Sequence, residues 1–369
     1  MHILHVVGAR PNFMKAAPVL AAFRDYGVRQ TLVHTGQHYD AMMSDIFFQQ
    51  LGMPQPDINL AVGSGTHAGQ TAEIMMRFEP VVLEQEPDLI TVYGDVNSTV
   101  AAALVGAKLR IPVAHVEAGL RSNDRGMPEE INRLVTDQLS DLLFTPSEDG
   151  DRNLLREGVD PQKIYQVGNV MIDTLVRLLP VAEAVKRDDD VFGSPYALVT
   201  LHRPSNVDDP EMLARLMSAL NALSHDVRVV FPVHPRTRAR IADLGGALVN
   251  RNIKLIDPVG YIDFLALQLH ATVVITDSGG IQEETTYLGI PCLTVRGNTE
   301  RPITVSVGSN VLVGHDMDRL LVEARLVLAG KAKRGQIPPL WDGRAARRLA
   351  DCAVAAYVDW TGTPLQVVA

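Results

Sequence analysis

Short apolar runs of strand length alternate, along the first half of the chain, with segments in which apolar residues recur at helical spacing. The helical spacing is clearest at residues 16–23, 96–109 and 131–139. Strands that alternate with helices in this way pair side by side in a parallel sheet. The runs that predict strands are 3–7, 30–34, 89–93, 113–116, 142–145 and 164–167.

The alternation stops after residue 186 and then begins again. Residues 187–195 contain three consecutive aspartates followed by Gly, Ser and Pro, a composition that favours a solvated linker over a metal-binding acidic motif. The second series predicts strands at 196–201, 227–233, 253–256, 273–276 and 291–295. We therefore predict two α/β domains, the first at 1–170 and completed by a C-terminal helix at 352–369, the second at 171–351.

Two parallel sheets also predict where ligands bind. Open parallel sheets bind ligands beyond the carboxyl ends of their strands. We expect two Rossmann-like domains that face each other across a central cleft, with the polar motifs gathered there. The glycines at 63, 65 and 69 have the wrong spacing for the dinucleotide fingerprint GxGxxG, so a nicotinamide cofactor is not expected.

Composition narrows the classes of function. The chain has 369 residues, 46% of them apolar, and a net charge of −9, which argues against general binding to nucleic acid or anionic lipid. Cys292 and Cys352 have no metal-ligand spacing and are expected to be free thiols. No leader peptide and no apolar run of membrane-spanning length is evident, which predicts a cytoplasmic protein.

The predicted first strand is followed by Gly-Ala-Arg-Pro-Asn-Phe-Met-Lys at residues 8–15. Gly8 allows a tight turn and Pro11 suits the start of a helix. Arg10 and Lys15 then flank the end of the strand, where two cations can hold a phosphate or a leaving oxyanion. The alternative is a solvated pair of cations at a helix entrance.

Three acidic residues follow strand ends or begin a helix in the first domain. Asp95 follows the strand at 89–93, Glu117 follows the strand at 113–116, and Glu129 stands at a predicted helix start. Neighbouring carboxylates separate one another's pKa values, so that one can act as a base while another remains protonated or stabilises positive charge. We predict these three as the catalytic set, and Glu130 as a helix cap or surface residue.

The second domain carries cations and a glycine-rich turn at its strand ends. His202 and Arg203 are expected to face a ligand, whereas His234 and Arg236 are equally compatible with a surface role. Residues 276–284 read Thr-Asp-Ser-Gly-Gly-Ile-Gln-Glu-Glu, so that the helix start at Ser278, Gly279 and Gly280 suits a diphosphate. Glu284, one turn inside that helix, is placed to accept ribose hydroxyls, and Arg301 adds a guanidinium.

Together these segments resemble the non-hydrolysing UDP-N-acetylglucosamine 2-epimerases, which share the two-domain architecture of GT-B glycosyltransferases. The resemblance implies that Arg10, Lys15, Asp95, Glu117, Glu129 and His202 surround the sugar and leaving diphosphate, and that Phe264 packs near the uracil. It implies a homodimer and no cofactor or metal. The motifs that carry it are 8–15, 35–40, 93–99, 115–122, 127–133, 276–285 and 299–302.

The chain departs from the family pattern at several places. Where many members read His-Arg-Arg-Glu, this sequence has Pro204 and Ser205, and Val259 replaces a glutamine found in some relatives. Bacterial relatives bind a second UDP-sugar as an activator through positions that match Gln37, His38, Arg203 and His234 here. Residues 39–40 and 235–238 differ from that pattern, so the resemblance does not carry activation over to this chain.

The implied reaction is elimination of UDP to a 2-acetamidoglucal and its re-addition with the proton delivered to the opposite face, which interconverts UDP-GlcNAc and UDP-ManNAc. The C2 proton has no adjacent carbonyl to acidify it, which is why the C1–O bond breaks as well. Alternatives are a hydrolysing relative that releases ManNAc and UDP, a 2-epimerase for a UDP-2,3-diacetamido uronic acid, a GT-B glycosyltransferase, and a UDP-sugar sensor without activity.

Overall fold

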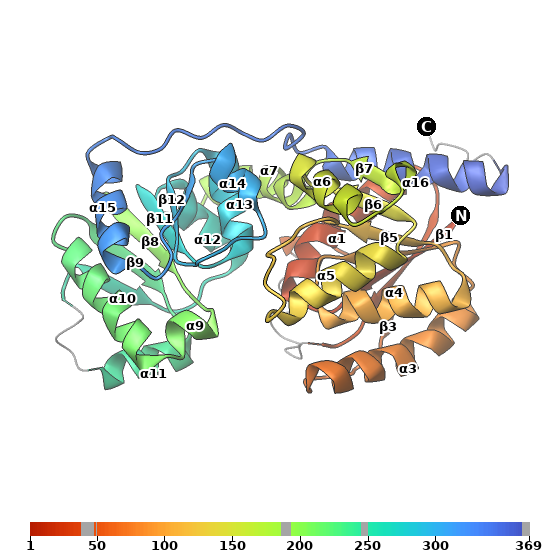
Figure 1. Cartoon of the computed structure of the whole chain (residues 1–369), viewed down its shortest axis with the longest axis horizontal. Coiled ribbons are helices and arrows are strands. Elements are labelled where there is room, and N and C mark those ends of the chain that lie inside the picture. The colour runs from red at the N-terminus through yellow and green to blue at the C-terminus, as the bar shows by residue number, and fades with distance from the viewer. Residues whose placement is uncertain (38–47, 49, 186–192, 245–249, 364–369) are drawn as a thin grey trace. The chain divides into compact units, whose positions relative to one another are not determined.

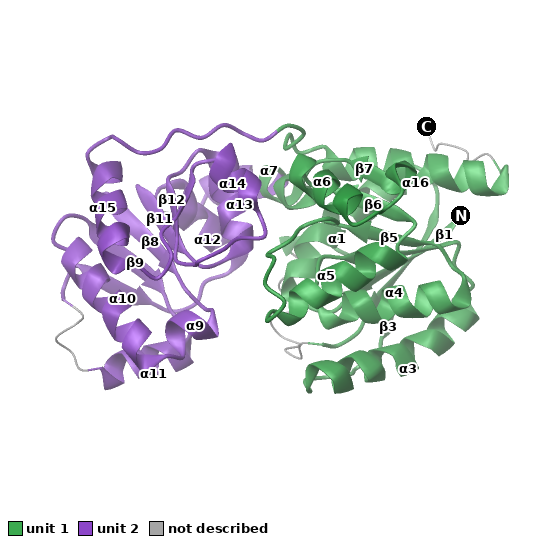
Figure 2. Cartoon of the chain, in the orientation of Figure 1, with its two compact units in different colours: residues 1–176, 339–369 green, residues 177–338 purple. Residues whose placement is uncertain are grey.

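The computed structural model describes residues 1–37, 48, 50–185, 193–244 and 250–363. It contains two compact units, unit 1 at 1–176 and 339–369 and unit 2 at 177–338 (Figure 2). The acidic triplet at 188–190 and the last predicted helical residues, 364–369, lie outside the described residues. Unit 1 is therefore discontinuous in sequence. The chain passes from unit 1 to unit 2 within the helix that contains residues 176 and 177, and it returns to unit 1 at residue 339, before the last helix begins.

Unit 1 is a seven-stranded parallel sheet with the strand order β3-β2-β1-β4-β5-β6-β7 (Figure 1). Its strands are β1 His2–Val7, β2 Arg29–His34, β3 Ile58–Asn59, β4 Leu89–Tyr93, β5 Val113–Val116, β6 Leu142–Thr145 and β7 Ile164–Gln166. Its helices are α1 Arg10–Arg24, α3 His67–Gln85, α4 Asn97–Leu109, α5 Pro128–Leu139, α6 Glu148–Arg156, the 3-10 turn Pro161–Lys163, the first half of α7 Val170–Glu183, and α16 Ala345–Thr361.

Unit 2 is a six-stranded parallel sheet with the order β10-β9-β8-β11-β12-β13. Its strands are β8 Tyr196–Thr200, β9 Arg228–Pro232, β10 Ile253–Ile256, β11 Val273–Thr276, β12 Cys292–Thr294 and β13 Asn310–Leu312. Its helices are α9 Pro204–Val207, α10 Pro210–Leu223, α11 Pro235–Asp243, α12 Tyr261–Leu269, α13 Gly279–Leu288, α14 Pro302–Ser306 and α15 Met317–Leu328. The prediction of two parallel-sheet α/β domains is confirmed.

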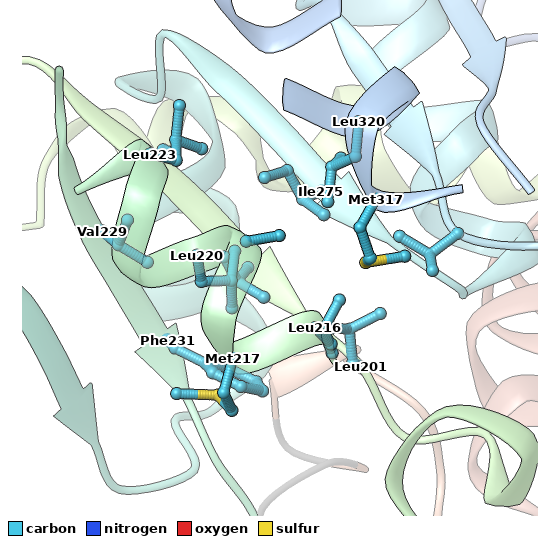
Figure 3. Packing of buried hydrophobic residues seen from close by; sticks show 14 of the residues in the cluster. Leu201, Leu216, Met217, Leu220, Leu223, Val229, Phe231, Ile275, Met317 and Leu320 are labelled. Atoms are coloured by element: carbon cyan, nitrogen blue, oxygen red, sulfur yellow. The ribbon is translucent and has the colours of Figure 1, made fainter. Parts of the chain in front are cut away.

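Each unit buries its own apolar core between sheet and helices. In unit 2, α10 and α15 cover one face of the sheet, and their side chains interlock with those of the strands (Figure 3). Met217 of α10 lies beside Phe231 of β9, Leu216 of α10 lies beside Leu201, and Leu320 of α15 lies near Ile275 of β11. Strands buried on both faces read as continuous apolar runs, and those runs are what made the strands visible in the sequence.

The returning C-terminal segment is fastened to unit 1 by polar contacts as well as by packing. The Asp173 carboxylate accepts hydrogen bonds from the backbone N–H groups of Ala345 (3.1 Å) and Ala346 (2.7 Å) and so caps the start of α16. The Trp341 indole donates to the Pro146 carbonyl (2.9 Å), and the Tyr26 hydroxyl donates to Asp351. Helix α16 packs against α1, so the C-terminal segment completes the first core.

In each sheet the strand order reverses at the first strand of the unit: β1 lies between β2 and β4, and β8 lies between β9 and β11. These points lie between β1 and β4 in unit 1 and between β8 and β11 in unit 2. Parallel sheets bind ligands at such switch points. The polar motifs at 8–15, 93–99, 200–203 and 276–284 all follow these four strands.

Candidate functional site

The turn after β1 in unit 1 is held in shape by one buried side chain. The Asn12 side-chain oxygen accepts hydrogen bonds from the backbone N–H groups of Gly8 and Ala9, both at 3.1 Å. Its amide nitrogen donates to the Tyr93 carbonyl at the end of β4 (2.8 Å). Asn12 thus fixes the start of α1 against the neighbouring strand, and Arg10 projects from the first turn of that helix, where it is exposed.

Lys15 and Glu117 form a buried ion pair beneath this turn. The Lys15 Nζ atom lies 2.7 Å from Glu117 Oε1, and the two side chains are 6% and 3% exposed. The lysine also packs on Gly94, where a Cβ atom would lie 2.6 Å from Nζ. Gly94 precedes Asp95, so one cation contacts both of the turns that carry the first two predicted carboxylates. The prediction that these residues lie at the same sheet edge agrees with this geometry.

Glu117 has an unusual backbone conformation. Its φ is +75°, in the left-handed region that residues with a side chain seldom adopt. The N–H groups of Glu117 and Ala118 both donate to the Phe144 carbonyl of β6, at 3.1 and 3.0 Å. A strained residue held by its surroundings is common at functional sites and costs about 1–3 kcal/mol.

Asp95 is paired with a different cation. Arg133 of α5 donates to the Asp95 carboxylate and also to Glu130 Oε2, from Nη2 at 2.8 Å. Glu130 is only 2% exposed and also accepts from Ser122 N (2.9 Å) and Asn123 N (2.9 Å). The expectation that Glu130 is a helix cap or surface residue is therefore wrong. It is a buried acceptor that closes the loop at 122–123, and these hydrogen bonds lower its pKa although burial alone would raise it.

Glu129 differs from the other two carboxylates. It lies in the first turn of α5 and is half-buried. Among the described residues, no hydrogen bond or ion pair engages its carboxylate. Its neighbour in sequence carries the structural role, which leaves Glu129 available to a substrate.

In unit 2 a buried aspartate organises the strand ends. Asp277 follows β11 and accepts from the His202 ring (Nδ1, 2.9 Å), from Arg203 N (2.9 Å) and from Asn206 Nδ2 (2.9 Å). Burial alone would raise the pKa of Asp277, but these hydrogen bonds outweigh burial and lower it. The His202 side chain is 64% exposed. Asp277 thus presents His202 and Arg203 at the switch point of the second sheet.

The start of α13 follows directly. Ser278 precedes the helix, and Gly279 and Gly280 are half-buried at its first turn. The Arg301 guanidinium lies on Gly279, where a Cβ atom would be 2.4 Å from Nη1. The first N–H groups of a helix have no partner within the helix and attract anions. A guanidinium beside them makes this turn a site for a phosphate.

Arg301 belongs to a cluster of charged side chains that holds its guanidinium in place. Arg301 Nε lies 2.8 Å from Glu283, and Glu300 is held by both terminal nitrogens of Arg296, at 2.8 and 2.7 Å. Arg203 Nη2 approaches Glu300 at 3.4 Å. Burial alone would raise the pKa of Glu300, but the arginines lower it well below its usual range. This cluster orients two of the predicted ligand cations, Arg203 and Arg301.

Glu284 lies inside α13 and is 2% exposed. The Tyr261 hydroxyl donates to its Oε1 atom at 2.9 Å. Burial raises the pKa of Glu284 to about 7, although the hydrogen bond from Tyr261 opposes this. Phe264, also on α12, is half-buried and packs against an apolar cluster, as Val259 and Ile281 do. A carboxylate with one supporting donor and an aromatic ring nearby suit a nucleoside.

The residues matched to an activator site have other contacts here. Gln37 is buried and accepts from Ser98 N (3.1 Å) and Ser98 Oγ (2.7 Å). His234 is exposed and caps α11, its ring accepting from Arg236 N (3.3 Å), and Arg236 pairs with Asp208. His38 lies outside the described residues.

The buried polar residues that position the candidate site residues were not identified from the sequence. Arg133 in unit 1 and Asp277 in unit 2 are buried partners of predicted residues, and His115 and Asp137 form a buried pair in unit 1. Three of the four lie within motifs already noted, at 115–122, 127–133 and 276–285. The pairs Asp95–Arg133, His115–Asp137 and His202–Asp277, however, join residues that are far apart in the sequence, and spacing along the chain does not reveal such pairs.

Among the described residues, no group of three or more His, Cys, Asp or Glu side chains is arranged to hold a metal ion. Within the same residues, no helix has both the length and the apolar composition needed to cross a membrane.

Comparison with known proteins gives a consistent result. The sequence profile described as UDP-N-acetylglucosamine 2-epimerase matches residues 21–353. The UDP-N-acetylglucosamine 2-epimerase of Methanocaldococcus jannaschii is 42% identical over 95% of this chain and 98% of its own. The UDP-2,3-diacetamido-2,3-dideoxy-D-glucuronate 2-epimerase of Pseudomonas aeruginosa is 44% identical over 95% of this chain and 99% of its own.

A solved structure agrees with the fold. The crystal structure of the Methanocaldococcus jannaschii UDP-GlcNAc 2-epimerase, in complex with UDP-GlcNAc and UDP, superposes with a TM-score of 0.88 at 41% identity, covering 96% of this chain and 100% of that chain. On sequence profile, relatives and fold together, this chain belongs to the UDP-N-acetylglucosamine 2-epimerase family.

Proposed function

We propose that this protein interconverts UDP-N-acetylglucosamine and UDP-N-acetylmannosamine without hydrolysing them. The observation that supports this most directly is the set of carboxylates in unit 1. Glu117 and Asp95 follow neighbouring strands, and each is paired with a cation, Lys15 and Arg133 respectively. A glycosyltransferase with the same nucleotide-binding half has no need of such a set.

Most of the proposed nucleotide-binding residues belong to unit 2. The Ser278 side chain and the first N–H groups of α13, at Gly279 and Gly280, receive the diphosphate together with Arg301, His202 and Arg203. Glu284 accepts the ribose hydroxyls, and Phe264 packs near the base. The anion is thereby met by donors that are already in place, which favours a reaction in which negative charge develops on the leaving group.

The proposed sugar chemistry belongs to the carboxylates. The C1–O bond breaks, and its electron pair leaves with UDP. A carboxylate removes the C2 proton, so that a C1–C2 double bond forms and gives the 2-acetamidoglucal. Arg10 and Lys15 stabilise the departing diphosphate, while the ionised carboxylates stabilise the cationic sugar. UDP then adds back at C1, and a carboxylate on the other face of the ring delivers a proton to C2.

Among the three carboxylates, Glu129 is proposed as a proton carrier because the other two are held by cations. A carboxylate that is paired with a cation is well suited to stabilising positive charge in the sugar. General acid–base catalysis by a positioned side chain contributes about 10²- to 10⁴-fold in rate. We therefore expect Glu129→Gln to abolish exchange at C2 with little change in UDP binding.

The test is NMR of the purified protein with UDP-N-acetylglucosamine in D₂O. The expected result is the manno epimer with deuterium at C2 and UDP still attached to the sugar. Free UDP with free N-acetylmannosamine would assign the hydrolysing reaction instead. UDP binding without deuterium incorporation would exclude epimerase activity on this substrate and favour a transferase or a sensor.

A second candidate function is supported by one comparison. The Pseudomonas aeruginosa relative, named as an epimerase for the 2,3-diacetamido glucuronate sugar, is as similar to this chain as the N-acetylglucosamine enzymes. The two reactions use the same C1 and C2 chemistry and differ only in the substituents at C3 and C6. Parallel assays with both sugar nucleotides separate them, and the substrate with the higher kcat/KM is the assignment.

A homodimer and a cytoplasmic location remain predictions of the family resemblance and of the sequence. Sedimentation analysis of the purified protein measures the first, and fractionation of cells measures the second.

A further inference from the structure

A fully buried network of charged side chains lies behind the carboxylates of unit 1 and takes no part in the proposed chemistry. His115, on β5, is 0% exposed, and its partner Asp137, on α5, is 1% exposed. The His115 Nδ1 atom lies 2.6 Å from Asp137 Oδ1, and Nε2 lies 2.8 Å from the Gly94 carbonyl oxygen. One imidazole thus links α5 to the turn that carries Asp95.

The two partners determine where the protons are. A carbonyl oxygen only accepts, so Nε2 must carry a hydrogen. Asp137 Oδ2 already accepts from Gly119 N (3.1 Å) and from Arg121 (2.7 Å). Both of these donors favour the charged form of the Asp137 carboxylate. Asp137 is therefore ionised, and the hydrogen between Oδ1 and Nδ1 belongs to the histidine.

We propose that His115 is a positioning residue whose ring donates from both nitrogens, to Asp137 and to the Gly94 carbonyl, and so fixes the two turns carrying Asp95 and Glu117. It carries a hydrogen on both ring nitrogens and donates to an acceptor on each side. The inference deepens the proposed function and, as a statement about activity, rests on it.

The position of the network shows how it acts on both turns. His115 precedes Glu117 by two residues and reaches Gly94, which precedes Asp95. Asp137 holds Gly119 N on the far side of Glu117, and Asn153 Nδ2 holds the Gly119 carbonyl (2.9 Å). Hydrogen bonds therefore fix the turn on both sides of Glu117, whose φ is +75°. The strain at Glu117 persists only where its surroundings determine it in this way.

The charges around the imidazole are balanced. Asp137 faces it from α5, and Arg121 pairs with Asp137 and with Glu157, through Nε to Oε1 at 2.8 Å. Two cations and two carboxylates thus alternate, which is the condition under which buried charges are tolerated. Removing one member leaves a charge without its partner, so the network acts as a unit.

A second buried histidine provides an internal control. His5 of β1 is also 0% exposed, but its Nδ1 atom lies 2.7 Å from the Tyr93 hydroxyl, a group that can accept or donate. Burial lowers the pKa of His5 to about 3, so this ring is neutral. The two strands thus carry matched buried histidines whose protonation states differ because only His115 faces a carboxylate.

The deciding experiment is long-range ¹H–¹⁵N NMR of the whole protein labelled at histidine, at about pH 8, well above the ordinary histidine pKa of about 6.5. His115 is expected to show two protonated ring nitrogens, and His5 one protonated and one bare nitrogen. A bare nitrogen on His115 would overturn the proposal. The signals are assigned with His115→Gln and His5→Gln, and if His115→Gln does not fold, the Asp137→Asn spectrum assigns them instead.

The effect on the reaction is measured with Asp137→Asn, which keeps the shape of the side chain and makes His115 neutral. We expect kcat to fall by about 10- to 100-fold, the effect of a small misplacement of reacting groups, while KM and UDP affinity change less than about threefold. An unchanged kcat with a neutral His115 would overturn the positioning role. The NMR measurement does not require turnover, so it tests the hydrogens on His115 independently of activity. If the unmutated protein lacks epimerase activity, the proposed function is contradicted but the NMR result for His115 still holds.

Discussion

Glu284 is the residue whose charge state is most open to change at physiological pH. Its carboxylate is buried, and its pKa is raised to about 7 in the unliganded protein. A raised pKa means that the folded protein binds this proton more tightly than the unfolded chain, whose value is 4.5. Its contribution to folding stability is therefore largest below about pH 4.5 and is lost as pH rises through about 7.

For ligand binding, the sign is opposite. Ribose hydroxyls donate to the ionised carboxylate, so UDP affinity should rise with pH and level off above about 7. At one pH unit below the pKa only about a tenth of the sites are ionised, so affinity falls by up to about tenfold. Calorimetry at several pH values tests this, with Glu284→Gln as the control because UDP itself titrates near pH 6. An equal pH dependence in both proteins would contradict it.

Lys15 and Glu117 give a second prediction at the scale of residues. Lys15→Met leaves the Glu117 carboxylate buried without its cation, and breaking a buried pair in this way costs about 3–5 kcal/mol of unfolding free energy. The double variant Lys15→Met with Glu117→Gln removes both charges and should recover most of that stability. Denaturant unfolding measures the recovery. Epimerase activity should stay lost in both variants, because both residues are proposed to act on the substrate.

The residues proposed to contact a ligand stand out more clearly in the sequence than the residues that support them. Lys15, Asp95, Glu117 and Glu284 stand in motifs at strand ends, where residue type and position together indicate chemistry. Arg133 also stands in a motif, but nothing in the sequence says that it pairs with Asp95. Such pairs depend on how α5 packs against α4 and β5, and that is a property of the tertiary structure.

At the scale of elements, the turn after β5 depends on a glycine. Gly119 has a φ of +80°, and a Cβ atom there would lie 2.5 Å from the Gly150 carbonyl oxygen of α6. Gly158 has nearly the same φ, +81°, but nothing lies within 4 Å of its Cβ position. Alanine substitutions at Gly119 and Gly158 therefore separate the cost of backbone strain, present at both positions, from the cost of a steric clash, present only at Gly119.

We expect Gly158→Ala to cost about 1 kcal/mol, the strain of a left-handed alanine. Gly119→Ala should cost more, by about 1–3 kcal/mol, because the backbone of α6 must move. It should also lower kcat, since the same turn carries Glu117. Unfolding by denaturant and steady-state kinetics measure the two effects. If both variants lose the same stability, the close approach to Gly150 is not what requires a glycine.

Strand positions were predicted well because buried parallel strands are continuously apolar. The runs at 89–93, 113–116, 142–145, 253–256 and 273–276 match β4, β5, β6, β10 and β11 in both ends. The edge strands β3 and β13 were missed because they have only two and three residues. The apolar helical spacing at 16–23 and 131–139 begins after the first turns of α1 and α5, which include the polar residues Arg10, Asn12, Glu129 and Glu130.

At the scale of the whole molecule, we propose that nucleotide binding and the chemistry at the sugar depend on different units. Most of the nucleotide contacts are assigned to unit 2 and the carboxylates to unit 1. We therefore expect Asp95→Asn to lower kcat by at least about 100-fold while UDP still raises the melting temperature as much as it does in the native protein. At 100 times its Kd a ligand stabilises the folded state by about 2.7 kcal/mol. Loss of the UDP-induced shift in Asp95→Asn would contradict this division.

The fold class and the presence of two domains followed from the repeated alternation of strands and helices. The point at which the C-terminal segment rejoins unit 1 could not be predicted, because residues 339–344 form no helix or strand with a recognisable pattern. Trp341 and the cap supplied by Asp173 fasten that segment, and both contacts join residues more than 170 positions apart.

The discontinuity of unit 1 has a consequence for protein synthesis. All of unit 2 leaves the ribosome before α16, so the second unit in the sequence is the first whose residues are complete. Until residues 345–361 emerge, the nascent chain exposes the surface of α1 that α16 covers. We expect ribosome-bound chains that stop before Ala345 to resist protease across 193–338 and to be cut within 1–176, a reversal of the usual order in which N-terminal domains fold first.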